Sequence, residues 1–271
     1  MTPDIDRITH LIEDTAAHEV RPRFRALAEG DVREKAAGDL VTVADEAAEA
    51  VLARRLVEAL PGALVLGEEA AARDAAVLDR LADPAPVWVI DPVDGTGNFA
   101  RGHPVFAVMV ALVQHGETRA AWIHEPMEGR TTCATLGGGA FTNGVRLHLP
   151  PAPTQASDLV GTLHASQYGT PSLRRRLDRR RSRVQAVRSL RCAGAEYVRM
   201  AHGTQHFSIF TKLAPWDHAP GTLILREAGG VAGLLDGRPY TPAVREASGL
   251  LLAPDAESWQ RLYDTLVGGG D

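Results

Sequence analysis

The stretch Trp88-Val89-Ile90-Asp91-Pro92-Val93-Asp94-Gly95-Thr96-Gly97-Asn98 decides the fold and the chemistry that this sequence predicts. Its apolar run, Val87–Ile90, lies between Pro86 and Asp91-Pro92 and has the length of a buried strand. Asp91 and Asp94 follow where that strand is expected to stop. Two carboxylates three residues apart on a turn can converge on one hard cation, because such metals take oxygen ligands. We therefore interpret the stretch as a site at a strand end.

Length and composition favour a cytoplasmic protein. At 271 residues the chain can bury a substantial core, as one large domain or two modest ones. No run approaches the roughly 18 apolar residues of a membrane span, and residues 1–6 do not resemble a signal peptide. The net charge of −5 gives no global attraction to nucleic acid, so we expect neither a membrane nor a nucleic-acid partner. Cys133 and Cys192 are expected to be reduced, buried thiols.

Helical and strand patterns alternate along the chain, which indicates an α/β fold. Helical spacing marks residues 5–27 (divided near Pro22), 45–60, 173–183, 195–202, 222–228 and 255–266. Strand-like runs mark 63–66, 87–90, 105–113, 120–123, 159–163, 207–210, 231–235 and 249–252. Pro150, Pro151 and Pro153 interrupt these patterns. We take them as the boundary between an N-terminal half, 1–150, and a C-terminal half, 151–271.

Acidic residues stand at four places: Asp45, Glu68, the Asp91 turn and Asp217. They suit phosphoryl transfer to water, because divalent ions neutralise a phosphate and lower the pKa of bound water. The backbone amides of Gly95 and Thr96 are candidates for holding phosphate oxygens. Two simpler interpretations stay open. Glu68, with Glu69, can favour the start of the following helix, and Asp217 can be the N-cap of the helix at 222–228, since Pro220 is tolerated only near a first turn.

Two other features have competing interpretations. His202, His206 and His218 raise the possibility of a transition-metal site, but their scattered spacing and the oxygen-rich carboxylate set favour magnesium. The basic run 174–183, interrupted by Asp178, allows contact with RNA or an acidic partner. Without interleaved aromatic residues it is more typical of a solvated helix face.

Four motifs in order carry a resemblance to a known family. They are Asp39-Leu40-Val41-Thr42-Val43-Ala44-Asp45, Gly67-Glu68-Glu69, Asp91-Pro92-Val93-Asp94-Gly95-Thr96-Gly97-Asn98-Phe99, and Trp216-Asp217-His218-Ala219-Pro220-Gly221 with Glu227-Ala228-Gly229-Gly230. In this order and approximate spacing, from about Lys35 to Gly230, they resemble the successive signatures of the inositol monophosphatase family. One such motif is weak evidence, whereas four in order are strong.

The resemblance implies a layered α/β/α/β/α sugar-phosphatase fold with two mixed sheets, a homodimer, and two or three Mg²⁺ ions per site. It implies metal ligation by Glu68, Asp91, the Val93 carbonyl, Asp94 and Asp217. By the same resemblance, Gly95 and Thr96 would meet the phosphate. Asp45 would orient or polarise the Thr96 hydroxyl, which with Glu68 and a metal ion would activate the attacking water, so these three are the expected catalytic residues.

The sequence departs from the family pattern on the substrate side. Gly97 stands where the family commonly has a second threonine, and residues 207–213 lack the acid that inositol-preferring members carry there; Lys212 sits near its place. The segment around Arg191 and Ala193 resembles the other part of the substrate wall. We expect Arg191, Ala193 and Lys212 to contact substrate, the two basic residues meeting a second negative group. The alternative is that they are ordinary surface residues.

The expected function is therefore magnesium-dependent hydrolysis of a small soluble phosphomonoester, nominally inositol monophosphate or a related polyol or sugar phosphate. Fructose 1,6-bisphosphate, histidinol phosphate and 3′-phosphoadenosine nucleotides are alternatives within the same chemistry. An alternative of another class is a catalytically weak regulatory protein that binds metal and phosphate.

Overall fold

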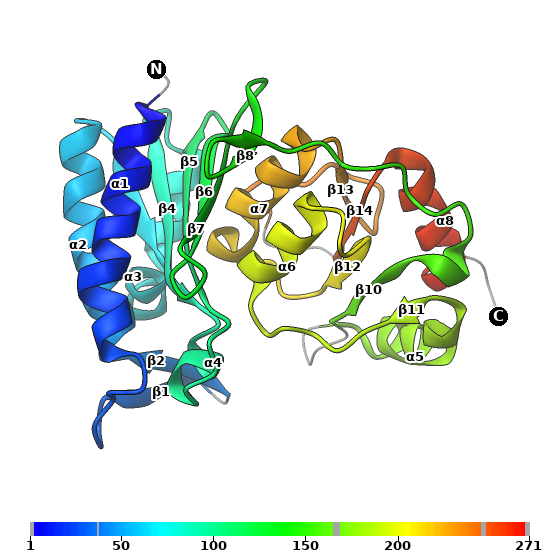
Figure 1. Cartoon of the computed structure of the whole chain (residues 1–271), viewed down its shortest axis with the longest axis horizontal. Coiled ribbons are helices and arrows are strands. Elements are labelled where there is room, and N and C mark those ends of the chain that lie inside the picture. The colour runs from blue at the N-terminus through cyan, green and yellow to red at the C-terminus, as the bar shows by residue number, and fades with distance from the viewer. Residues whose placement is uncertain (1–2, 37, 165–168, 245–247, 269–271) are drawn as a thin grey trace.

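Two mixed β-sheets form the framework of the molecule, and helices lie between them and on their outer faces (Figure 1). The computed structural model describes residues 3–36, 38–164, 169–244 and 248–268. Ala37, in the segment that leads to the first predicted motif, lies outside these residues. Within the described ranges, no helix is both long and apolar enough to cross a membrane.

The larger sheet comes from the N-terminal half, and its strands run in the order β3-β4-β5-β6-β7-β8-β9. β3 and β4 are parallel, and the other neighbours are antiparallel. A separate hairpin, β1–β2, precedes α2. The elements of this half are α1 (Ile5–Thr15), β1 (Val32–Ala36), β2 (Asp39–Thr42), α2 (Val43–Ala59), β3 (Leu64–Gly67), α3 (Glu68–Arg73), β4 (Val87–Asp94), α4 (Thr96–Ala100), β5 (Ala107–Gln114), β6 (Glu117–Glu125), β7 (Arg130–Thr135), β8 (Gly139–Thr142) and β9 (Val145–Arg146).

The smaller sheet has the order β11-β10-β12-β14-β13 and is also mixed. β10 is parallel to β11 and β12, whereas β14 is antiparallel to β12 and β13. The elements of this half are β10 (Val160–Leu163), α5 (Pro171–Arg180), β11 (Gln185–Ala186), α6 (Ala193–Ala201), β12 (Phe207–Phe210), α7 (Pro215–Glu227), β13 (Val231–Leu234), β14 (Leu250–Ala253) and α8 (Ala256–Leu266).

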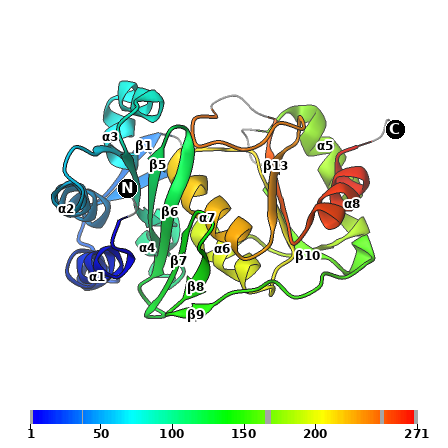
Figure 2. The ribbon, with the colours of Figure 1, turned by 90° about the horizontal axis from the view of Figure 1, so that it is seen from above.

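The layers follow from how these elements pack. α1 and α2 cover the outer face of the larger sheet, α6 and α7 lie between the two sheets, and α5 and α8 lie beyond the smaller one (Figures 1 and 2). α2 packs on β4, α7 contacts β5, β6 and β7 on one side and β13 on the other, and α8 packs on β14. The predicted layered α/β/α/β/α fold with two mixed sheets is confirmed.

Strand β4 is buried at all of its positions because it is covered on both faces. Trp88 and Ile90 pack into the cluster formed with α1 and α2. Val87 and Val89 belong to a cluster on the other face, with Ala219 of α7. Successive side chains of a strand point to opposite faces, so a strand covered on both faces has a continuous apolar run. This explains the sequence pattern from which the strand was predicted.

Two predicted boundaries are wrong at the site. β4 does not end before Asp91 but continues to Asp94, because Asp91 pairs with Met109 and Asp94 with Ala107 across an irregular step. Helix α7 begins at Pro215, with Ala214 as its N-cap, so the N-cap interpretation of Asp217 is also wrong. Asp217 lies in the first turn, and Pro220 is inside the helix rather than near its start.

The two predicted halves correspond to the two sheets in sequence, since the larger sheet ends at Arg146 and the smaller begins at Val160. Helices α6 and α7 belong to the second half of the chain but pack against strands of the first. The division at 150 and 151 into separate domains stays a prediction.

Candidate active site

The acidic residues meet at one edge of the larger sheet because of its topology. β3 and β4 are parallel with Gly67 opposite Ile90, so the next residues, Glu68 just after β3 and Asp91 within β4, come to the same end of the two strands. Asp217 comes from α7, which packs against β4. Carboxylate oxygens of Asp91, Asp94 and Asp217 all lie within 4.8 Å of one another. Residues from two segments far apart in the chain, β4 and α7, thus form one acidic cluster.

Burial gives this cluster a strong affinity for positive charge. Burial raises the pKa of Asp91 well above its usual range, and repulsion from Glu68, Asp94 and Asp217 raises it further. Burial and the neighbouring Asp94 and Glu68 raise the pKa of Asp217 to about 8. Such a group of buried acids is relieved either by protonation or by a bound cation. Its donors are all oxygens, the ligands that Mg²⁺ takes, so the residues fit that ion.

The Asp94 carboxylate is held in place by the start of α6. The Cys192 thiol donates to it at 3.0 Å, and the N–H groups of Ala193 and Gly194 donate at 3.1 and 2.6 Å. Burial raises the pKa of Asp94, and these three donors partly oppose that rise. These hydrogen bonds therefore connect the acidic cluster, on β4, to helix α6 of the C-terminal half.

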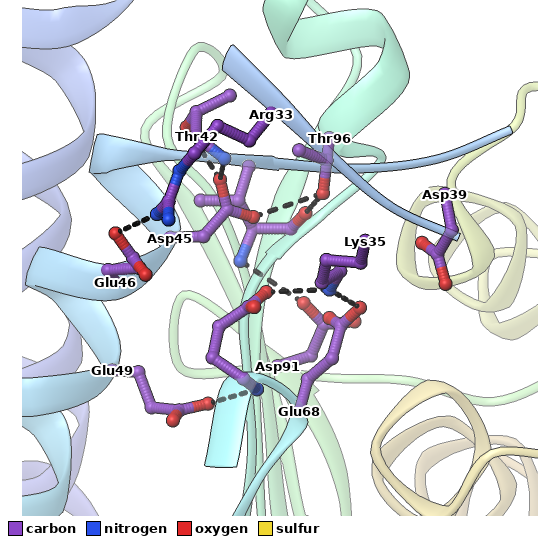
Figure 3. Close-up of polar contacts among 12 residues, drawn as sticks. Arg33, Lys35, Asp39, Thr42, Asp45, Glu46, Glu49, Glu68, Asp91 and Thr96 are labelled. Atoms are coloured by element: carbon purple, nitrogen blue, oxygen red, sulfur yellow. Dashed lines mark hydrogen bonds and ion pairs between the residues drawn. The ribbon is translucent and has the colours of Figure 1, made fainter. Parts of the chain in front are cut away.

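Glu68 faces a lysine that the sequence analysis did not single out for a role. The Lys35 Nζ lies 2.9 Å from a carboxylate oxygen of Glu68 and 2.8 Å from one of Glu69. Figure 3 shows the Lys35 side chain directed toward Glu68. Burial lowers the pKa of Lys35, but the two carboxylates raise it by more. The N–H groups of Glu69 and Ala70 are capped by Glu49 of α2, at 2.7 and 2.9 Å.

Asp45 connects the first turn of α2 to the central stretch. One of its oxygens accepts from the Thr42 N–H and hydroxyl, at 2.9 and 2.5 Å, and so closes the capping box of α2. The other lies 3.0 Å from the Thr96 hydroxyl, which also lies 2.9 Å from the Val93 carbonyl (Figure 3). Burial raises the pKa of Asp45 to about 7, and hydrogen bonds from Thr42 oppose that rise.

The turn after β4 requires glycine at position 95. Gly95 has φ of 88°, and a side chain there would come within 3.1 Å of the Val105 carbonyl and 3.3 Å of the Arg191 carbonyl. Asn98 then donates to the carbonyls of Val105 and Leu190, both at 2.8 Å. The central stretch therefore also positions the loop that carries Arg191.

A cavity of about 450 Å³ opens over the acidic cluster. Its lining includes all the predicted metal-ligating and phosphate-binding residues, together with Arg101, Arg191 and Lys212. Ala193 instead lines an adjoining cavity of about 210 Å³, which shares Arg191 and Lys212 with the first. Arg191 and Lys212 are thus pocket residues.

The three histidines make other contacts. His202 lies 3.0 Å from the Thr142 hydroxyl, and His206 accepts from the Val160 N–H at 3.0 Å. The His218 Nε2 lies 2.9 Å from the Lys212 carbonyl, which can only accept, so Nδ1 accepts from a tyrosine hydroxyl at 3.0 Å. Burial lowers the pKa of His218 to about 4, which keeps it neutral. The transition-metal interpretation receives no support from these contacts.

Lys35, Arg101 and Cys192 are pocket or cluster residues that sequence reasoning assigned no site role. Only the spacing of Arg101 carried a usable signal: it stands four residues after Gly97, whose carbonyl accepts from its guanidinium at 2.7 Å. The contacts of Lys35 and Cys192 join segments far apart in the chain and leave no local pattern.

Comparison with known proteins agrees with this geometry. The sequence model of the inositol monophosphatase family matches residues 4–267. The chain belongs to the inositol monophosphatase family. Phosphatase IMPL1 of Arabidopsis thaliana, a chloroplastic protein, is 34% identical over 220 residues, which cover 76% of this chain but only 56% of that protein. The fructose-1,6-bisphosphatase/inositol-1-monophosphatase of Thermotoga maritima is 31% identical over 200 residues, covering 74% of this chain and 73% of that protein.

A solved structure extends the match over nearly the whole chain. The crystal structure of the extragenic suppressor protein suhB from Bartonella henselae superposes with a TM-score of 0.80 at 25% identity, covering 98% of this chain and 99% of that chain. The layered architecture is therefore the fold of the inositol monophosphatase family, a family of phosphoric monoester hydrolases.

Proposed function

We propose that this member of the inositol monophosphatase family is a magnesium-dependent phosphatase acting on a small soluble phosphomonoester, nominally inositol monophosphate or a related polyol or sugar phosphate. The observation that carries the proposal is the cluster of buried Asp91 and Asp94 with half-buried Asp217, in the lining of a cavity that Thr96 also lines. A phosphate group brings the negative charge that two or more cations on such a cluster can bind.

In this proposal, Glu68, Asp91, the Val93 carbonyl, Asp94 and Asp217 hold two or three Mg²⁺ ions. When bound, the metal neutralises phosphate charge and lowers the pKa of water. The backbone amides of Gly95 and Thr96 bind phosphate oxygens.

The protein groups around Thr96 orient the nucleophile. The Thr96 hydroxyl has a single hydrogen, which it donates either to Asp45 or to the Val93 carbonyl. Its lone pairs remain able to accept a hydrogen bond from the attacking water, while Glu68 accepts the proton of that water. The water oxygen then bonds to phosphorus and the ester P–O bond breaks. The leaving alkoxide oxygen takes up a proton from solvent, and Glu68 releases the proton that it accepted to solvent. No covalent enzyme intermediate is required.

The substrate within this class is the open part of the proposal. Fructose 1,6-bisphosphate, histidinol phosphate and 3′-phosphoadenosine nucleotides are alternatives, and the name of the Thermotoga maritima relative joins an inositol and a fructose substrate. We infer that Arg191, Ala193 and Lys212 form the substrate wall, since all three line the cavities described above.

Phosphate release from a panel of these esters, with and without Mg²⁺, tests the function. We expect turnover only with the metal, and the ranking of kcat/KM identifies the preferred ester. Metal-dependent binding without turnover of any ester would instead support the catalytically weak regulatory protein.

Three further properties are proposed with the activity: a homodimer, cytoplasmic location, and a division of the chain into two units, residues 1–150 and 151–271. Sedimentation or light scattering checks the dimer, because either technique gives the mass in solution. Fractionation of the producing cells checks the location. Limited proteolysis near the proline-rich segment 150–153 checks the units.

A further inference from the structure

We propose that His164, Arg191 and Lys212 form a subsite for a second oxyanion, a phosphate or carboxylate on the alcohol part of the substrate. All three line the 210 Å³ cavity that adjoins the acidic cluster. The inference rests on the proposed phosphatase function and narrows its substrate class to esters that carry a second anion.

A buried carboxylate organises one side of this subsite. Glu196 of α6 is fully buried, and its Oε2 lies 2.7 Å from the His164 Nε2. The His164 ring also stacks on Phe210, with ring centres 4.5 Å apart. Its backbone is tied to the strand beside it, since its N–H donates to the Ile209 carbonyl and its own carbonyl accepts from Thr211. The imidazole is therefore fixed in orientation at the cavity wall.

The same carboxylate shapes the turn that carries Arg191. The Glu196 Oε1 accepts from the Ser189 hydroxyl and the Leu190 N–H, both at 3.0 Å. Ser189 in turn accepts from the Arg191 N–H at 2.9 Å. Arg191 has φ of 54°, a left-handed conformation that costs a non-glycine residue about 1–2 kcal/mol. A conformation of this kind persists where surrounding contacts impose it, and such positions cluster at binding sites.

Lys212 directly follows Thr211, whose hydroxyl donates to the His164 carbonyl. The Lys212 carbonyl accepts from His218, which fixes the backbone just ahead of α7. Its Nζ lies 3.5 Å from Asp39, and its side chain remains 43% exposed. An ammonium in an exposed pair of this kind can exchange its partner for a substrate anion at small cost, because exposed pairs contribute only about 0–1 kcal/mol.

The hydrogen-bonding character of the cavity matches an oxyanion better than a neutral polyol. Among the described lining residues, the carboxylates are Asp94 and Asp217, and both belong to the acidic cluster. Of the other ionisable lining side chains, Arg191 and Lys212 are donors only, and His164 has a second ring nitrogen besides the one that contacts Glu196. Cys192 and His218 already make the contacts described above. Arginine in particular matches phosphate and carboxylate through paired N–H groups.

Two matched pairs of esters test the proposal. Fructose 1,6-bisphosphate and fructose 1-phosphate differ by one phosphate, and 2-phosphoglycerate and glycerol 2-phosphate differ by one carboxylate. With Mg²⁺ present, we expect kcat/KM to favour the doubly anionic member of at least one pair by about tenfold or more, as for one charge-assisted hydrogen bond. The pair that shows the preference identifies the anion.

Three substitutions identify the residues that produce the preference for the doubly anionic ester. Arg191→Met and His164→Gln are each expected to reduce it about tenfold, mainly by raising KM for the doubly anionic ester. Glu196→Gln tests the positioning role, since it should lower the preference itself, whereas a merely structural role would slow both members equally. The matched control is Arg188→Met, because Arg188 is exposed in the same segment and lines neither cavity.

Equal kcat/KM within both pairs overturns the subsite but leaves the phosphatase function standing. So does a loss of preference in Arg188→Met as large as that in Arg191→Met. If no ester is hydrolysed, the proposed function fails instead. Calorimetric titration of the same pairs then still measures the subsite, and equal affinities within each pair overturn it.

Discussion

The proposed metal end of the pocket and its proposed substrate wall are positioned in different ways. At the metal end, Asp91, Asp94 and Thr96 belong to one continuous stretch, and the two aspartates are buried on β4. At the wall, Arg191 is exposed and Lys212 nearly half so. The backbone around Arg191 depends on Glu196 and Asn98, which come from other elements.

This difference separates the reaction from the choice of substrate. Asp91 and Asp94, which we propose as cation ligands, are fixed by a strand, so the proposed chemistry follows in large part from a local motif. The cationic wall is assembled by packing of α6 against the rest of the molecule, so a few substitutions there can change the substrate without altering the metal end. Four predictions test this difference between the two regions, ordered from the largest expected effect to the smallest.

Asp91→Asn should reduce turnover most. It removes one charge from the buried cluster, and we expect kcat to fall roughly 10³-fold, the scale of losing one preorganised electrostatic contact to the transition state. Magnesium-dependent phosphate release measures the effect, and circular dichroism confirms folding. Asp178→Asn, at an exposed position of α5, is the control. Undiminished turnover at saturating Mg²⁺ would remove Asp91 from the metal site.

Gly221→Ala should break the contact that joins the two regions. A methyl group there would lie 2.1 Å from the ring of Tyr197, which is fully buried where α6 meets α7. We expect the free energy of unfolding to fall by about 3 kcal/mol, from overpacking. Urea denaturation measures it. The control is Gly97→Ala, whose methyl would meet only the exposed Arg101 guanidinium at 3.1 Å, with a change of about 0.5 kcal/mol or less. Equal losses in the two variants would contradict the packing argument.

Thr96→Val should separate water activation from binding. The valine keeps the shape of threonine but removes the hydroxyl that contacts Asp45 and the Val93 carbonyl. We expect kcat to fall about 10²-fold, the lower range for a group that assists proton transfer, with KM little changed. Steady-state kinetics resolves the two parameters. Thr204→Val, at an exposed position, serves as the control. A rise in KM with unchanged kcat would assign Thr96 to binding alone.

Glu49→Gln should flatten the dependence of stability on pH. Burial raises the pKa of Glu49 to about 7, although two backbone N–H groups oppose the rise. The raised pKa means that the folded protein binds more protons than the unfolded chain. The contribution of Glu49 to the free energy of unfolding is therefore complete below pH about 4.5 and is lost as the pH rises through 7.

Between pH 5 and 8, ionisation of Glu49 should lower the free energy of unfolding of the wild-type protein by about 2 kcal/mol. Glu49→Gln should not show this loss. Urea denaturation at several pH values measures the slope. Glu58→Gln, an exposed position on the same helix, should keep the wild-type slope. An equally steep slope in Glu49→Gln would show that other buried acids, such as Asp45, carry the whole effect.

Much of the fold was predictable because many helices and strands follow from the spacing of apolar residues over a few positions. The run at 87–90 indicated a buried strand, and the runs at 105–113 and 120–123 indicated the two strands that pair as β5 and β6. The errors occurred where tertiary contacts override local signals. Pairing with β5 carries β4 through Pro92, and packing of α7 between the sheets keeps Pro220 inside a helix.

The sequence by itself determined which side chains are available and in what order. From this came the motifs, the oxygen-rich donor set, the family and the class of reaction. Only the tertiary structure decided which of these residues meet. The parallel pairing of β3 with β4 brings Glu68 to the same edge as Asp91, and the packing of α7 brings Asp217 there.

The contacts of Lys35 with Glu68, and of Glu196 with His164, likewise exist only in the folded chain. The physical reason is the separation of these residues along the chain. Backbone geometry relates residues a few positions apart, whereas residues 30 or more apart are brought together by sheet topology and by burial of apolar faces, which no local pattern records.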